Sequence, residues 1–270
     1  MTAVIISADD YAMDDGVDTA VLALARQGVI TATSAMVLSP AWPEAGRRLA
    51  DVEVSRGLHL DLTSPFAEAD GGAPAMSLPG IMSAAFRRSL DRAAIRRAIG
   101  RQLARFEAVM QAPPDFVDGH QHVHHLPGIG EELVAALTER YGKAASAVAL
   151  RLCIARRWRG LKAAIIASTG AGRLAPLAAG RAHPTNSDFA GVYGFSPQAD
   201  LAGLWRSWLS GLLGERPLVM CHVAVENAAT KWPDGIRAAR LNEGRWLASP
   251  AFRDLCAELG IERAAWRGRG

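Results

Sequence analysis

The sequence has few cysteines, few aromatic residues and no long apolar run, and each shortage excludes a class of protein. The three cysteines, Cys153, Cys221 and Cys256, lie far apart without a C-x-x-C pair, which excludes a disulfide framework and predicts buried thiols in a reducing compartment. No apolar run reaches the roughly 18 residues of a membrane span. Aromatic residues make up only 6% of the chain and the basic residues are scattered, which argues against a nucleic-acid surface.

The amino terminus lacks the features of a targeting segment. Val4-Ile5-Ile6 runs at once into two acidic residues, with no basic segment before it and no long apolar stretch. The net charge of +3 arises from 27 Arg and 3 Lys against 27 acidic residues, which is close to balance. We therefore expect a soluble, cytoplasmic protein with a small-molecule substrate and no nucleic-acid or membrane partner. The oligomeric state is not fixed by the sequence, and a homodimer remains open.

Short apolar runs alternate with helical patterns along all 270 residues. We expect strands at Val4–Ala8, Thr31–Leu38, Val54–Leu62, Phe116-Val117, Val148–Ile154, Leu218–Val223 and Ile261–Trp266. We expect helices at Gly16–Gln27, Pro43–Leu49, Leu90–Met110, Gly130–Tyr141, Trp158–Thr169, Ala199–Leu213 and Ile236–Leu259, the last broken near Ser249-Pro250. Residues 63–82 and 180–197 are expected to be loops. This alternation predicts one α/β domain, residues 1–270, built as a TIM-like (β/α) barrel with six or seven parallel strands.

Residues that bind metals follow several of these strands directly. Asp9-Asp10 follows the first apolar run, His59 lies near the end of the third, and His222 lies near the end of Leu218–Val223. The carboxyl ends of parallel barrel strands share one rim, where sites are built. Carboxylates and imidazoles on one rim are the ligand set of a divalent metal. We therefore expect a metal site there.

The segment Asp118–His125 contains four of the seven histidines and follows another strand. If this segment is extended, alternation places His120, His122 and His124 on one face. Such a run is more specific than a single histidine, and we interpret it as part of the metal site.

Several of these segments resemble the signatures of YdjC-like carbohydrate deacetylases, the group of the chitooligosaccharide deacetylases. The matching segments are Ser7–Ala12, Gly28–Met36, Gly57–Leu62, Asp118–His124, Val219–His222, Asn242-Glu243 and Leu247–Pro250. The resemblance implies a distorted (β/α) barrel that hydrolyses the N-acetyl group of an amino sugar or oligosaccharide. Two places depart from the family pattern, Tyr11-Ala12 and Val223-Ala224, and they bear on the substrate rather than on the core chemistry.

The resemblance also implies roles, position by position. Asp10, His59 and His120 would bind one divalent metal cation, Asp9 would be the base and His222 the general acid. The family resemblance suggests Mg²⁺, whereas two imidazoles suit Zn²⁺ or another transition metal better.

An amide needs all of these groups because its carbonyl is a poor electrophile and its amine a poor leaving group. A divalent metal polarises the carbonyl and lowers the pKa of water, a base takes the proton of the attacking water, and an acid protonates the departing nitrogen. Arg151, at the end of a strand, is expected to orient Asp9 or to bind sugar oxygens. His124 is a further candidate for contact with the substrate or for support of the metal ligands.

Two other functions remain open at this point. A metal-dependent barrel phosphoesterase also uses H-x-H runs, but no second set of bridging carboxylates and no glycine-rich phosphate loop is visible. A non-catalytic, metal-stabilised carbohydrate-binding protein would not need an acid and a base, whereas this chain has both Asp9 and His222.

Overall fold

A computed structural model describes residues 2–70, 76–226 and 234–266. Its strands are β1 (Thr2–Tyr11), β2 (Ala32–Ala35), β3 (Ser55–Leu60), β4 (Phe116–Gly119), β5 (Ala149–Leu150), β6 (Phe189–Ala190), β7 (Leu218–Cys221) and β8 (Ile261–Arg263). Seven of them pair in the order β5-β4-β3-β2-β1-β7-β6, every pair is parallel, and β8 pairs with the amino end of β1. An isolated parallel bridge between Leu150 and Thr185 joins β5 to the segment that precedes β6.

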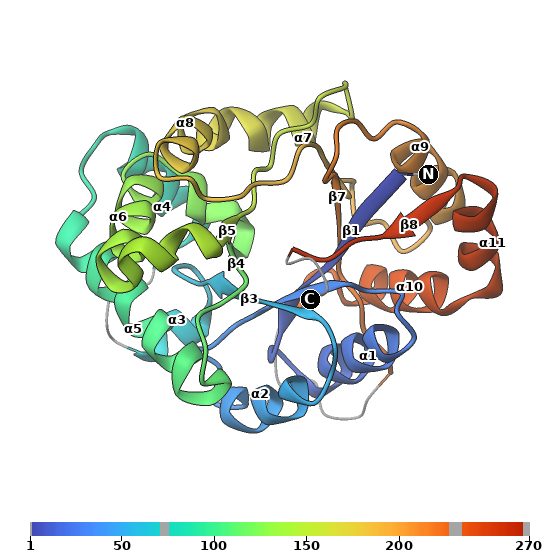
Figure 1. Ribbon diagram of the computed structural model, residues 1–270, viewed down its shortest axis with the longest axis horizontal. Coiled ribbons are helices and arrows are strands. Elements are labelled where there is room, and N and C mark those ends of the chain that lie inside the picture. Colours follow the sequence, from blue (N-terminus) through green and yellow to red (C-terminus); the bar gives the residue numbers. More distant parts are fainter. Residues whose placement is uncertain (1, 71–75, 227–233, 267–270) are drawn as a thin grey trace.

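Helices surround this curled sheet, as Figure 1 shows. They are α1 (Asp15–Arg26), α2 (Trp42–Ala50), α3 (Pro65–Asp70), α4 (Leu78–Phe86), α5 (Arg92–Met110), α6 (Ile129–Tyr141), α7 (Leu161–Ile166), α8 (Gly172–Gly180), α9 (Leu201–Ser210), α10 (Arg237–Ala248) and α11 (Pro250–Glu258). Tighter or wider turns form η1 (His120–His125), η2 (Gly142–Ala147) and η3 (Ala167–Ala171). The architecture is a distorted α/β barrel, which confirms the fold class expected from the sequence, and α10 ends at the break expected near Ser249-Pro250.

Four local expectations were wrong. The region 180–197 is not entirely a loop, because β6 lies within it and pairs with β7. The region 63–82 is not one long loop, because α3 and the start of α4 lie within it; prolines occupy the first turns of both helices, where a missing N–H costs nothing. Only Ala149–Leu150 of the expected strand Val148–Ile154 pairs as a strand. The segment after β4 is not extended but coils into η1, with Gln121 and His122 in the left-handed region at φ +52° and +63°.

The barrel interior is filled below the strand ends. Ile5, Ala32, Phe116, Ala149, Phe189 and Leu218, each from a different strand, pack there with Trp266. The Phe116 ring stacks on Trp266, with 5.4 Å between ring centroids. Gly57 leaves room for this ring, because a Cβ there would lie 2.4 Å from Phe116 Cζ. This packed floor closes the barrel interior below the carboxyl ends of the strands.

The outer core lies between the sheet and the helices. On α5 the buried side chains include Ile95, Ile99, Leu103 and Phe106, a helical period that faces the sheet. All three cysteines are buried and free, as expected. Within the described ranges, no helix has both the length and the apolar character needed to cross a bilayer.

Candidate active site

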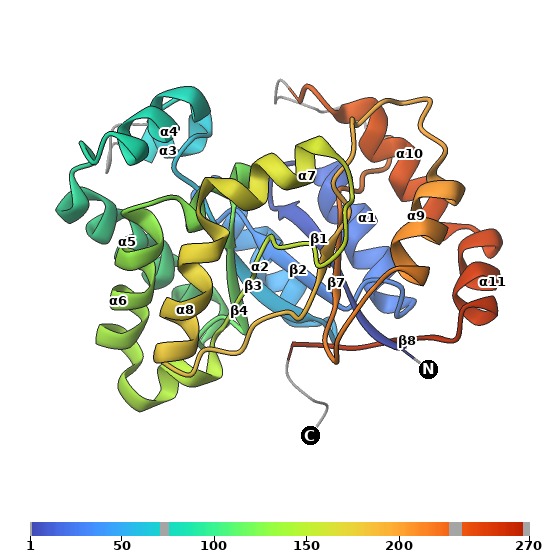
Figure 2. The same cartoon turned by 90° about the horizontal axis from the view of Figure 1, so that it is seen from above.

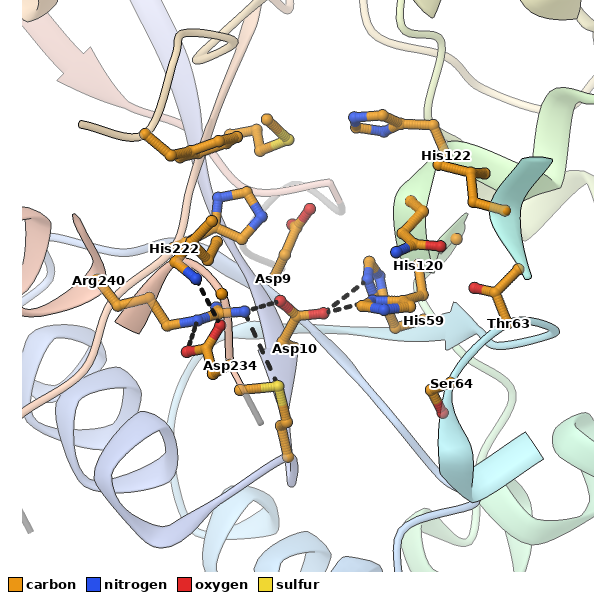
Figure 3. A pocket seen from close by; sticks show the side chains of 18 of the residues that line it. Asp9, Asp10, His59, Thr63, Ser64, His120, His122, His222, Asp234 and Arg240 are labelled. Carbon is orange, nitrogen blue, oxygen red and sulfur yellow. Dashed lines mark hydrogen bonds and ion pairs between the residues drawn. The ribbon is translucent and has the colours of Figure 1, made fainter. Parts of the chain in front are cut away.

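The three side chains expected to bind metal converge at the ends of three strands. Asp10 lies in β1, His59 lies in β3, and His120 follows β4 directly. Asp10 Oδ1 lies 3.1 Å from His59 Nε2 and 2.9 Å from His120 Nδ1. Figure 3 shows the three side chains pointing toward one another in one cavity. The fold therefore brings together three residues that are far apart in the sequence.

A backbone irregularity in β1 lets two neighbouring carboxylates enter this cavity. Regular alternation would place Asp9 and Asp10 on opposite faces of the strand. The pairing register shifts between Ala8 and Tyr11, and Asp10 adopts a φ of +68°. A bulge of this kind re-aims a side chain, and both Asp9 and Asp10 line the cavity. Such backbone strain is typical of functional sites.

Arg240, on α10, holds Asp10 from the side opposite the imidazoles. It is 3% exposed, its Nη2 donates to Asp10 Oδ2 at 2.6 Å, and its Nε donates to Asp234 Oδ2 at 2.8 Å. Burial alone would raise the pKa of Asp10, but Arg240 and His120 outweigh it and hold that pKa well below its usual range. Asp10 is therefore a carboxylate whose Oδ1 is directed at His59 and His120.

The other nitrogen of His59 is bound by a second carboxylate. His59 Nδ1 donates to Asp118 Oδ1 at 2.7 Å, and both side chains are buried. Burial alone would lower the pKa of His59, but Asp118 and Asp10 raise it to about 10. Asp10 and Asp118 thus stabilise positive charge at and around His59 Nε2.

Asp9 is fixed by an arginine that lies beneath the cavity. Arg151 Nη1 donates to Asp9 Oδ2 at 2.8 Å, and Nη2 donates to Asp9 Oδ1 at 2.6 Å. Nη2 also lies 2.5 Å from Asp118 Oδ2 and donates to Ser7 Oγ at 2.9 Å. Arg151 is fully buried and is absent from the described cavity lining, so its position agrees with orienting Asp9 and not with binding sugar oxygens.

His222 follows β7 and lines the same cavity. Its backbone N–H donates to Glu243 Oε2 at 3.0 Å, and its ring meets the Phe195 ring edge-on at 5.0 Å between centroids. Within the described chain, His222 Nδ1 has no hydrogen-bond partner. Burial is the larger cause and the positive charge of the nearby Arg240 the smaller one that together lower the pKa of His222 to about 4. The expected proton donor is therefore uncharged at neutral pH.

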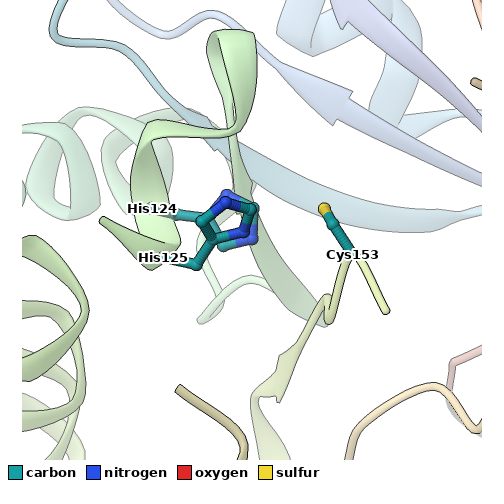
Figure 4. Close-up of side chains that lie close together, drawn as sticks. All are labelled: His124, His125 and Cys153. Atoms are coloured by element: carbon teal, nitrogen blue, oxygen red, sulfur yellow. The ribbon is translucent and has the colours of Figure 1, made fainter. Parts of the chain in front are cut away.

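His122 also lines this cavity, whereas the next two histidines of the run are not among its described lining residues. His124 and His125 are buried, and together with Cys153 they offer three potential ligand atoms within 4.8 Å of one another (Figure 4). His124 Nε2 bonds to the Arg151 carbonyl at 3.0 Å, and Cys153 Sγ lies 3.5 Å from His122 Nδ1. Burial lowers the pKa of His124 to about 3 and raises that of Cys153 above its usual range. His124, expected to contact the substrate, is not among the described residues that line the cavity.

The cavity has a volume of about 550 Å³ and a lining that is mostly apolar away from the carboxylates and imidazoles. Its apolar part includes Leu78, Ile166, Val192, Phe195, Met220 and Ile236. Polar groups concentrate around Asp10 and at the start of α3, where Thr63 and Ser64 also line it. One end of the cavity can thus hold a polar, reacting group and the rest an apolar one.

The donor set fits a divalent cation. One carboxylate and two imidazoles match the ligand count of metal sites that keep positions open for substrate and water. Metal-binding histidines usually donate their second N–H to a carboxylate, as His59 does to Asp118. Two imidazoles favour zinc or another transition metal over magnesium, which prefers oxygen ligands.

Three residues around the site were not assigned from the sequence. Asp118 lies at the end of a strand, just before the histidine run. This position could have indicated a carboxylate that binds a metal-ligating histidine. Arg240 and Glu243 are three residues apart, so they share a face of α10. The sequence of this helix does not indicate which strand ends it covers, so their place in the site could not be predicted. Tyr193 Oη donates to Glu243 at 2.9 Å, and burial raises the pKa of Glu243 to about 8.

Comparison with known proteins gives the following matches. The family model described as YdjC-like protein matches residues 3–258. Carbohydrate deacetylases from Homo sapiens and Mus musculus are each 30% identical over 152 residues, which is 51% of this chain and 46% and 47% of those proteins. A chitooligosaccharide deacetylase from Yersinia pestis (strain Pestoides F) is 31% identical over 144 residues, 49% of this chain and 54% of that protein. The match thus spans about half the length of these relatives.

A solved structure shares the fold. The crystal structure of a candidate cellobiose-phosphate cleavage protein from Enterococcus faecalis V583 superposes with a TM-score of 0.70 at 20% identity. The superposition covers 98% of this chain and 97% of the other. The curled barrel is therefore a known architecture.

Proposed function

Because the chain belongs to the YdjC-like family, we propose that it is a metal-dependent hydrolase that removes the N-acetyl group from an N-acetylated amino sugar or oligosaccharide. The observation that carries this proposal is the convergence of Asp10, His59 and His120 beside Asp9 in the cavity that His222 also lines. The names of the curated relatives, carbohydrate deacetylase and chitooligosaccharide deacetylase, point to the same reaction.

In this proposal Asp10 Oδ1, His59 Nε2 and His120 Nδ1 hold one divalent cation. A cation at this position supplies the positive charge that polarises the acetyl carbonyl and favours ionisation of water. Arg240 keeps Asp10 ionised, and Asp118 holds one proton of His59 on Nδ1, so that the proton on the opposite nitrogen is the one that the cation replaces. The donor set supports zinc or another transition metal, while the family resemblance suggests magnesium.

Asp9 is the base. Each of its oxygens accepts one hydrogen bond from Arg151 and retains a further lone pair, so the carboxylate can accept a proton while its orientation stays fixed. Arg151 is therefore a positioning residue. Taking the proton of the attacking water generates the nucleophile for the acetyl carbon.

His222 delivers the proton to the leaving nitrogen. Since the ring is uncharged at rest, it first has to gain a proton, and the nearby charges of Asp9 and Asp10 favour that gain. A proton that Asp9 takes from water can reach His222 and then pass to the nitrogen, after which the amine leaves. Because Asp10, from β1, and Arg240, from α10, meet at one site, we also propose that residues 1–270 act as one catalytic domain.

One assay separates this function from its competitors. Acetate and phosphate release are measured for the protein incubated with a divalent cation and a panel of N-acetylated saccharides and sugar phosphates. Acetate release that Asp9→Asn lowers by at least about 100-fold supports the deacetylase. Phosphate release instead would support the barrel phosphoesterase, and saccharide binding without turnover would support the binding protein.

A further inference from the structure

The cavity opens on a face that exposes large apolar side chains. In the described part of the chain, these side chains are Phe86, Trp158, Leu161, Ile165 and Val225. All five lie in connections that leave the carboxyl ends of β3, β5 and β7, the ends that carry the cavity. Figure 2 shows α4 and α7 on the side of the molecule opposite β8. Exposed apolar surface of this kind marks an interaction site when it is concentrated on one face.

Helix α7 connects this face to the cavity. Leu161 and Ile165 are 68% and 51% exposed, and as residues four apart they share one side of the helix. Their neighbours Lys162 and Ile166 line the cavity. Trp158, three residues before the first residue of the helix, is 76% exposed. Apolar surface therefore extends from the outside of the molecule to the apolar end of the cavity.

Two exposed arginine pairs flank the aromatic rings of this face. They are Arg87-Arg88, directly after Phe86, and Arg156-Arg157, directly before Trp158. Among residues 2–70, 76–226 and 234–266, no carboxylate forms an ion pair with any of these four side chains. Elsewhere on the surface Arg206 pairs with Glu258. Positive charge on this face is thus available to an anionic partner.

We propose that this face, made by Phe86–Arg88, Arg156–Trp158, Leu161 and Ile165, docks on an anionic membrane surface, and that the substrate is an N-acetylated amino sugar carried on a lipid. The second part rests on the proposed function. Basic side chains are attracted to anionic headgroups, and exposed aromatic and aliphatic side chains insert at the boundary of headgroups and acyl chains. The sugar then reaches Asp10, while the apolar lining beside α7 accepts the adjoining part of the lipid. This proposal replaces the expectation, drawn from the sequence, of no membrane partner.

Membrane docking is tested by sedimentation of the full chain with vesicles of phosphatidylcholine, with and without an equal part of phosphatidylglycerol. The protein should sediment with the anionic vesicles, and about 1 M salt should release it through screening. Arg156→Gln/Arg157→Gln should weaken binding about fivefold for each charge removed. The matched control is Arg97→Gln/Arg253→Gln, which removes two exposed charges on α5 and α11 and should leave binding within about twofold of the wild type.

Substrate choice is tested with two glycosides of the same N-acetylated amino sugar. One carries a long alkyl chain and is embedded in the anionic vesicles, and the other carries a methyl group and is dissolved. The variant Trp158→Gln/Leu161→Gln/Ile165→Gln changes exposed residues that do not line the cavity, so it should fold normally and keep its turnover of the methyl glycoside. It should lose most turnover of the embedded glycoside.

Each other outcome overturns a defined part of the account. Turnover of the methyl glycoside without sedimentation on anionic vesicles would overturn the docking proposal and leave the deacetylase standing. Sedimentation without turnover of either glycoside would leave the docking face standing and overturn the proposed function. A dimer by analytical ultracentrifugation that the apolar triple variant dissociates would show that a second copy, and not a membrane, covers this face.

Discussion

His59 donates its Nδ1–H to Asp118 Oδ1 at 2.7 Å, and this bond directs the opposite ring nitrogen at Asp10. Asp118 itself is paired with Arg151, which also holds Asp9. The proposed base and a proposed metal ligand are therefore fixed through one buried arginine. A substitution of Asp118 or Arg151 should therefore alter the position of both Asp9 and His59.

Asp118→Asn should weaken cation affinity about 10- to 100-fold, the usual cost of losing the carboxylate behind a metal-binding histidine. The amide keeps the size of the side chain but no longer stabilises the imidazole charge or fixes the tautomer of His59. Isothermal titration with zinc measures the effect. Asp70→Asn, which alters a carboxylate paired with Arg101 and Arg105 instead, is the control and should bind zinc like the wild type. Equal zinc affinity in both variants would show that Asp118 does not support cation binding by His59.

Cation binding should release about one proton at pH 7 to 8. His59 has a pKa raised to about 10, so its ring is charged in this range until a cation takes the place of the Nε2 proton. The release should vanish above pH 10, and Asp118→Asn should diminish it by lowering the pKa of His59. Titration calorimetry in buffers of different ionisation enthalpy counts the protons. Without a cation, the stability that the raised pKa gives is complete below the unfolded value of about 6.5 and is lost as the pH rises through 10.

Arg151→Met should destabilise the fold by about 3–5 kcal/mol, because it leaves the buried carboxylates of Asp9 and Asp118 without their shared cation. Urea denaturation followed by circular dichroism measures the loss. The same substitution at Arg206, which pairs with Glu258 on the surface, should leave the midpoint nearly unchanged. A wild-type midpoint for Arg151→Met would show that the two carboxylates do not need this arginine.

Asp9→Asn should retain the cation while turnover falls roughly 10²- to 10⁴-fold, the usual contribution of a general base. Asp10→Asn should lose the cation itself. Elemental analysis together with acetate release distinguishes the two roles of these neighbours. Cation loss in the Asp9 variant with retention in the Asp10 variant would exchange them.

His222→Ala should lose most activity on an N-acetyl sugar and much less on an aryl acetate, if the wild type cleaves that ester. A leaving group of low basicity needs little protonation, so only the amide depends on the proton from His222. NMR of the labelled imidazole should show a neutral ring at pH 7 that titrates near 4. Equal losses on amide and ester would argue that His222 only positions the substrate.

The sequence was sufficient for most of the parallel strands and for the residues at their ends, because buried apolar runs and polar strand ends are local patterns. It missed β6, whose two paired residues are too few to form such a pattern. It was not sufficient to predict the backbone conformation of the histidine run, and so not the orientation of its side chains. Alternation predicted one face for His120, His122 and His124, but left-handed backbone at Gln121 and His122 coils the segment and sends His124 into the protein. No residue in that run marks such a turn.

One partner of the site could not be predicted for a different reason. Arg240 meets Asp10 across 230 positions of sequence, and its role depends on how α10 covers the end of β1, which no local pattern contains. Arg151, by contrast, was expected to orient Asp9 or to bind sugar oxygens, and it bonds to Asp9 across 142 positions. The role of Asp118 was easier to predict, since it lies two residues before His120 and its strand is the next one along the chain after that of His59.

The central claim is that one cation bound by Asp10, His59 and His120 makes this chain a deacetylase. The most direct measurement is acetate release from an N-acetylated amino sugar by chelator-treated protein to which a divalent cation is returned. The account predicts no release before addition, a rise that saturates at one cation per chain, and no rise in His59→Ala or His120→Ala. Full acetate release by the chelated protein, or equal restoration in the two variants, would contradict it.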